Sequence, residues 1–213
     1  MCFLYQASKL PPDVFQDLQL VDEISEHVNQ RLIYPMYQAP LVRRDGDVLL
    51  VETREWGWLP AGWHPSDKYK TRKKYQRERI NARCETVHTT WGFKQEFARG
   101  QRCILLADAF HEPFQGTDGN WFACDPPMIG IAGLWADYQG DESIQSCTML
   151  TTDANEFVRE HRTGRMRMPV LLGEETARQW LDPDRHLPGD FQEVFRPLDP
   201  SLMKLVDPPE SKR

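Results

Sequence analysis

The chain has 213 residues, and its 26 Lys and Arg against 32 Asp and Glu give a formal charge of −6. This length is typical of one domain, or two at most, and 40% hydrophobic residues argue against a disordered chain. No apolar run approaches the roughly 20 residues of a membrane span, and the N-terminus has no basic stretch before an apolar run. We therefore expect a globular, cytoplasmic protein.

The hydrophobic pattern predicts one short helix followed by many short strands. Apolar residues at 14, 15, 18 and 21 after Pro11-Pro12 fit an amphipathic helix. The turn residues 44–47 before the apolar residues 48–51 predict a hairpin. Further strands are expected at 103–107, 128–135, 145–151 and 169–172, and a helix at 174–181.

Two glycines, Gly130 and Gly133, lie inside one predicted strand, where glycine indicates a bulge or a close approach of another backbone. Many short strands with few helices favour an α+β fold: a single mixed domain with a curved, partly open barrel-like sheet and a few peripheral helices. We expect this domain to span residues 1–206, and the polar residues 207–213 to form a flexible tail.

The five cysteines give no sign of a disulfide framework or a metal site. Their number is odd, no CxxC is present, and the spacing of Cys and His does not fit zinc. We expect no metal and no cofactor. Four of them lie in apolar surroundings and are expected to be buried, unreactive thiols: Cys84, Cys103, Cys124 and Cys147.

Cys2 differs because removal of Met1 would expose an α-amine beside its thiol. The two groups have pKa values of roughly 7.7–8 and roughly 8.5, so both are nucleophilic near neutral pH. The amine can form a Schiff base with an aldehyde, and the thiol can then close a thiazolidine ring. An N-terminal nucleophile hydrolase is an alternative use of the same pair, and a cysteine at position 2 without any function is another.

Three other segments carry chemistry. The basic run 68–79 follows the tryptophan-rich residues 56–63, a composition that suits a single-stranded nucleic acid or simply a solvated surface. Glu112 follows a buried strand, where a carboxyl can act as an acid or base or have a structural role. His161 precedes several arginines and suits proton transfer, or is an ordinary surface histidine.

The order of these segments resembles the SOS response-associated peptidase family, known for abasic-site processing. The resemblance runs from Cys2 to about Leu172. It is carried by the following elements: Met1-Cys2, Ala39-Pro40, Trp56-Gly57, Asn81-Ala82-Arg83-Cys84-Glu85-Thr86, Phe110-His111-Glu112, and His161 with Arg167-Met168-Pro169.

The resemblance implies that Cys2, after loss of Met1, crosslinks to an abasic site in single-stranded DNA as a thiazolidine. Glu112 and His161 would then assist proton transfer. The residues implied to hold DNA are Trp63, Asn81, Arg83, Arg165 and Arg167. We expect a monomer associated with the nucleoid, without a membrane partner.

Departures from the family pattern keep two other functions open. Phe3-Leu4 replace the Gly-Arg that usually follows the cysteine, and Tyr37-Gln38 replace the Asn of Asn-x-Ala-Pro. Glu112 is followed by Pro113 rather than Trp, and Arg165 stands where the tighter motif has its histidine. One alternative is a non-catalytic protein that binds single-stranded DNA. The other is a cysteine peptidase acting on other substrates.

Overall fold

The computed structural model describes residues 2–8, 15, 19–22 and 32–209. Its strands are β1 (Leu4–Ala7), β2 (Gln19–Asp22), β3 (Leu32–Ile33), β4 (Gln38–Asp45), β5 (Val48–Trp56), β6 (Asn81–Arg83), β7 (Arg102–Leu105), β8 (Ala107–Glu112), β9 (Asn120–Cys124), β10 (Gly130–Gln139), β11 (Ser143–Asp153), β12 (Arg167–Pro169), β13 (Leu171–Leu172) and β14 (Met203–Val206). Its helices are α1 (Arg72–Arg77), α2 (Lys94–Ala98), α3 (Glu156–Glu160), α4 (Glu174–Leu181) and α5 (Gln192–Phe195), with 3-10 turns at Pro188–Phe191 and Pro200–Leu202.

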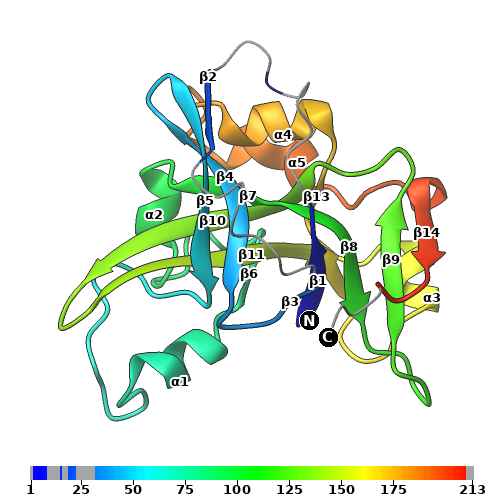
Figure 1. The fold of residues 1–213 in the computed structure, drawn as a ribbon, viewed down its shortest axis with the longest axis horizontal. Helices are drawn as coiled ribbons and strands as arrows, with labels where there is room; N and C mark the ends of the chain where they lie inside the picture. The colour runs from blue at the N-terminus through cyan, green and yellow to red at the C-terminus, as the bar shows by residue number, and fades with distance from the viewer. Residues whose placement is uncertain (1, 9–14, 16–18, 23–31, 210–213) are drawn as a thin grey trace.

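A ring of five strands forms the centre of the fold (Figure 1). The strands follow the order β11-β10-β7-β4-β5, and β5 pairs again with β11 in parallel through Ser146↔Glu55 and Cys147↔Trp56. This short parallel seam closes the sheet into a barrel. The predicted α+β fold with a curved, barrel-like sheet is therefore confirmed.

A second sheet lies beside the barrel and carries the N-terminal strand. Its order is β14-β9-β8-β1-β3. Strand β1 is antiparallel to both of its neighbours, with Tyr5 opposite Phe110 of β8 and Ile33 of β3. This pairing brings the start of the chain next to the end of β8, which is the arrangement that the site depends on.

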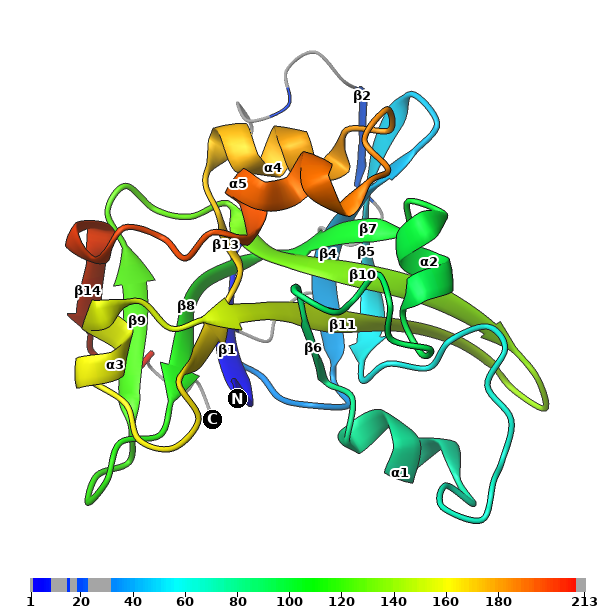
Figure 2. The ribbon, with the colours of Figure 1, turned by 180° about the vertical axis from the view of Figure 1, so that it is seen from behind.

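Neighbouring residues on the barrel strands point to opposite faces and form two cores. Val42 belongs to the outer core, together with Leu134 and Trp180 of α4. Leu41 belongs to the inner core, which fills the barrel and continues into the second sheet through Tyr5 and Cys2. Helices α4 and α5 lie together over one side of the barrel (Figure 2).

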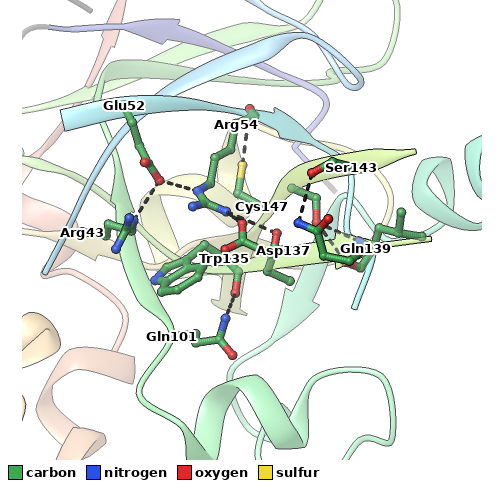
Figure 3. A network of polar contacts seen from close by, with 12 residues as sticks. Arg43, Glu52, Arg54, Gln101, Trp135, Asp137, Gln139, Ser143 and Cys147 are labelled. Atoms are coloured by element: carbon green, nitrogen blue, oxygen red, sulfur yellow. Dashed lines mark hydrogen bonds and ion pairs between the residues drawn. The ribbon is translucent and has the colours of Figure 1, made fainter. Parts of the chain in front are cut away.

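A buried charge network occupies part of the barrel interior (Figure 3). The Arg54 side chain is fully buried and pairs with Glu52 and, at 2.5 Å, with Asp137 across the barrel. The guanidinium groups of Arg43 and Arg54 lie 4.7 and 4.6 Å from the centre of the Trp135 ring. Because an unpaired buried charge is costly, this network ties β4 and β5 to β10.

Most predicted elements are confirmed, with the following differences. The helix expected near the N-terminus is wrong at its end, where Gln19–Asp22 pairs with β5 as β2, and its earlier part lies outside the described residues except Phe15. The strand expected at 103–107 is divided at Leu106 between β7 and β8, and the strand expected at 169–172 is divided at Val170. The basic run contains α1, whose first turn is capped by the Thr71 hydroxyl.

The four cysteines expected to be buried are buried, and all five in the chain are free thiols. The tail expected at 207–213 lies outside the described residues from 210 onward. Within the part of the chain that the structure describes, no helix has the length and apolar character needed to cross a membrane.

Candidate active site

Cys2 lies just ahead of β1 and is fully buried. Its Sγ donates to the carbonyl oxygen of Leu4 at 3.3 Å, and its own carbonyl oxygen accepts from the Asn81 amide Nδ2 at 2.9 Å. Burial raises the pKa of the Cys2 thiol to about 12, and the neighbouring Glu112 carboxylate adds to that rise. At neutral pH the thiol is therefore protonated and needs a base before it can attack.

Asn81 reaches Cys2 because its motif forms a strand along the barrel. β6 pairs in parallel with β11, Asn81 opposite Met149 and Arg83 opposite Thr151. Asn81 and Arg83 share one face of β6, while Ala82 between them is buried in the outer core. The Asn81 Oδ1 atom is buried and makes no hydrogen bond within the described residues, so an acceptor remains for a ligand donor.

Glu112 is the last residue of β8 and is fully buried. The pairing of Leu4 with His111 places the carboxylate close to Cys2. Its Oε2 atom lies 2.9 Å from Nη2 of Arg162, which is also buried. Burial raises the pKa of Glu112 to about 7, and the positive charges of the amino terminus and of Arg162 oppose that rise. Glu112 is therefore able to give or take a proton at neutral pH.

His161 follows α3, and contacts with Phe157 and Asn120 hold it in place. Its Nδ1 atom forms a hydrogen bond of 2.8 Å with the Phe157 carbonyl oxygen, and its ring centre lies 4.6 Å from that of Phe157. Its own carbonyl oxygen accepts from Asn120 Nδ2 at 2.8 Å. The cation that the fold brings to Glu112 is the next residue, Arg162.

The residues expected to hold DNA fall into two groups. Arg83 and Arg165 are exposed. Arg167 instead holds both carboxylate oxygens of Glu85 at 2.7 Å and pairs with Asp153 at 2.8 Å. Trp63 is 5% exposed, and its ring packs against Tyr75 and Tyr138 in the outer core. The Trp63 ring is therefore part of the core, and its contact with DNA stays a prediction.

A pocket of about 300 Å³ opens on the Asn81 side of the site. Its lining combines aromatic rings, hydroxyls, two arginines and one carboxylate, which accepts a hydrogen bond from the Tyr69 hydroxyl: Tyr69, Glu78, Arg79, Asn81, Ala82, Arg83, Thr86, Thr90 and Phe93. The Arg79 guanidinium lies 3.9 Å from the centre of the Tyr75 ring. Cations and flat apolar faces together suit a nucleotide. Among the described residues, no group of three His, Cys, Asp or Glu side chains is arranged to hold a metal ion.

The sequence model of the SOS response associated peptidase (SRAP) family matches residues 1–207. The chain belongs to this family. Two similar curated proteins are named abasic site processing proteins. The abasic site processing protein YoaM of Bacillus subtilis (strain 168) is 28% identical over 190 residues, which cover 81% of this chain and 74% of YoaM. The abasic site processing protein HMCES of Gallus gallus is 29% identical over 201 residues, which cover 80% of this chain and 54% of HMCES.

Two solved structures have a similar fold over nearly the whole chain. A protein from Bacteroides thetaiotaomicron matches with a TM-score of 0.79 at 19% identity, covering 97% of this chain and 92% of the other. A protein from Bordetella bronchiseptica matches with a TM-score of 0.74 at 27% identity, covering 97% and 100%.

Sequence reasoning missed one residue of this SRAP site. Arg162 is one of the arginines that follow His161, and the sequence does not indicate its partner. The available signal was its place beside a histidine ahead of an apolar strand. This position does not predict which residue Arg162 contacts, because Arg162 and Glu112 are 50 positions apart in the chain.

Proposed function

We propose that this protein processes abasic sites in single-stranded DNA by forming a thiazolidine crosslink through Cys2. The observation that carries the proposal is the placement of Cys2 between Asn81 and Glu112. Asn81 holds the Cys2 carbonyl oxygen at 2.9 Å, and Glu112 has its pKa raised by burial to about 7. The names of the curated relatives, abasic site processing proteins, supply the substrate class.

The first step is hydrolysis of the Met1–Cys2 peptide bond, which consumes one water and releases methionine. The free α-amine of Cys2 then attacks the aldehyde carbon of the ring-opened abasic sugar. The resulting carbinolamine loses its hydroxyl as water, with the proton supplied by an acid, and leaves a Schiff base. A carboxyl with a pKa of about 7 suits that donation, and Glu112 lies in place for it.

Ring closure follows when Sγ attacks the Schiff-base carbon. The C–S bond forms, the C=N double bond becomes a single bond, and the thiol proton ends on the nitrogen. Because the pKa of the buried thiol is about 12, the thiol is protonated before the attack. The ionised form of Glu112, produced in the preceding donation, is the nearby base that takes this proton and passes it on.

Single-stranded DNA fits the surface next to these groups. The pocket beside Asn81 offers aromatic and cationic side chains, and Arg83 is exposed at its edge. A flexible single strand can turn its sugar into a buried site more easily than a stacked duplex. His161 retains a supporting role in proton transfer as part of the proposal.

A peptidase acting on unrelated substrates is less well supported. Cysteine peptidases use a thiolate whose pKa is lowered by a neighbouring histidine. Here burial and a carboxylate raise the pKa of Cys2. A non-catalytic DNA-binding protein remains the second candidate, because Phe3 and Tyr37 are exposed at 51% and 44% where the family pattern has Gly and Asn.

The test is the intact mass of the protein before and after incubation with a single-stranded oligonucleotide that carries one abasic site. We expect loss of Met1 and a stable adduct whose mass is the sum of the two molecules minus one water. Cys2→Ser should abolish the adduct, while Cys124→Ser, another buried thiol, should leave it unchanged. An adduct that survives Cys2→Ser would contradict the assignment of the nucleophile. Binding without an adduct would favour the non-catalytic candidate.

A further inference from the structure

Arg162 is held in a defined position by its neighbours in the chain. The Thr163 amide donates to the Pro113 carbonyl oxygen at 2.9 Å, and Asn120 Nδ2 donates to the His161 carbonyl oxygen at 2.8 Å. The segment 161–163 is therefore fastened on either side of Arg162 to the region where β8 ends and β9 begins. Between these two attachments the Arg162 side chain is buried, with 3% of the residue exposed.

The guanidinium of Arg162 joins two parts of the site. Nη2 pairs with Glu112 Oε2 at 2.9 Å, and Nη1 donates to the Arg167 carbonyl oxygen. Arg167 is itself fixed, because its side chain holds Glu85, four residues beyond Asn81. Arg162 thus connects Glu112 to the segment that positions Cys2 through Asn81.

A buried arginine beside a buried carboxylate is a costly arrangement. Two well-packed apolar residues would often stabilise a fold as well or better. The planar guanidinium, however, fixes the direction of a carboxylate in a way that a lysine ammonium does not. Such a pair is therefore expected where the orientation of the carboxylate matters.

We propose that Arg162 is the positioning residue for Glu112, holding its carboxylate toward Cys2 and the lesion while a second contact anchors the guanidinium to the Arg167 backbone. This inference rests on the proposed function. The resemblance to the family implies proton transfer by His161, whereas the cation in contact with Glu112 is its neighbour Arg162. Arg162 contacts Glu112 and the Arg167 backbone, and it acts on the reaction through Glu112.

Removal of Arg162 should change both the rate and its pH dependence. The charged or titratable groups that act on Glu112 include the amino terminus of the chain, Arg162 and the Cys2 thiol, and in a processed protein the Cys2 amine takes the place of the present amino terminus. Loss of a cation in contact raises the pKa of a carboxyl by about one unit or more. A misplaced catalytic group slows a reaction by up to about 100-fold.

The experiment compares Arg162→Met, Arg162→Lys and the control Arg159→Met, which removes an exposed charge three residues away. Adduct formation is followed from pH 5 to 9, and the Glu112 carboxyl is titrated by ¹³C NMR. We expect Arg162→Met to be about 10- to 100-fold slower, with the Glu112 midpoint raised by about one pH unit or more. Arg162→Lys should be slower than the wild type but keep the midpoint near the wild-type value. Arg159→Met should match the wild type.

An unchanged midpoint and an unchanged rate in Arg162→Met would overturn the proposal. If Arg162→Met does not fold, Arg162→Lys decides, because a wild-type rate in that variant would show that the fork of the guanidinium is not needed. If the wild type itself forms no adduct, the proposed function fails. The NMR titration still tests the contact in that case, because it needs no DNA.

Discussion

Glu112 is fully buried at the end of β8, and burial raises its pKa to about 7 from an ordinary value of 4.5. An acid with a raised pKa binds its proton more tightly in the folded chain than in the unfolded one. Its contribution to stability is therefore complete below about pH 4.5 and is lost as the pH rises to about 7.

Glu112→Gln should remove this dependence. Between about pH 4.5 and about pH 7 the contribution of Glu112 to the free energy of unfolding falls by roughly 3 kcal/mol. We expect the free energy of unfolding of the wild type to fall relative to that of Glu112→Gln as the pH rises from 4.5 to 8. Urea unfolding at several pH values measures the difference. The exposed Glu160→Gln is the control and should follow the wild type. Parallel curves for the wild type and Glu112→Gln would contradict the raised pKa.

For single residues, much of the site could be predicted from the sequence. Cys2, Asn81 and Glu112 lie in short motifs, and the structure brings the three together. Arg162 could not be predicted, because its role comes from the register of β1 on β8 and from the attachment of segment 161–163 to Pro113. The buried ring of Trp63 was also beyond the sequence, since a tryptophan near a basic run looks the same whether it is exposed or packed.

At the scale of elements, residues 174–181 follow a local pattern, whereas residues 169–172 depend on distant strands. Residues 174–181 form a helix because their apolar side chains Ala177, Trp180 and Leu181 lie on one face. Residues 169–172 do not form one strand, because Val170 accepts from Ala132 of β10 and donates to Leu150 of β11. The chain therefore changes neighbours at Val170, and no local propensity shows that change.

Gly133 is a position where the predicted close approach of strands can be tested. A Cβ atom there would lie 2.6 Å from the Thr148 carbonyl oxygen and 2.4 Å from Leu105 Cδ1. Gly133→Ala should therefore destabilise the barrel by about 1–3 kcal/mol, because the backbone has to shift. Thermal or urea unfolding measures the loss.

Gly189→Ala is the matched control, since its Cβ would meet nothing within 4 Å and its backbone angle is ordinary. We expect its unfolding free energy to stay within about 0.5 kcal/mol of the wild type. Equal stability of the two variants would mean that β10 and its neighbours are not packed as closely at Gly133 as the structure shows.

Over the whole molecule, charge is distributed unevenly. The chain carries a net charge of −6, yet α1 exposes Lys73, Lys74 and Arg77, and the same region leads into the pocket beside Asn81. Arg72 is tied to Glu55 and Glu142, which fixes the helix against the barrel. A local positive surface of this kind can bind phosphate on an acidic protein.

We expect the triple substitution of Lys73, Lys74 and Arg77 by Gln to weaken the binding of single-stranded DNA. The dependence of this binding on salt concentration should also become less steep. Each lost phosphate contact reduces the slope of log K against log salt by about 0.7. Titration at several salt concentrations measures this slope. The control neutralises Arg159, Arg196 and Lys204, which are exposed elsewhere. The same slope in both triple variants would exclude α1 from the DNA contact.

The burial of every cysteine has one more consequence. All five thiols are free and shielded, and burial raises the pKa of each, to about 12 for Cys2 and Cys147 and about 11 for Cys124. Alkylating reagents and oxidants react with the thiolate and need access to the sulfur. At neutral pH they will therefore reach Cys84, Cys103, Cys124 and Cys147 through a local opening of the structure around each of them. The native cysteines thus act as built-in reporters, and the order in which they are labelled maps which parts of the barrel and of the N-terminal sheet open first.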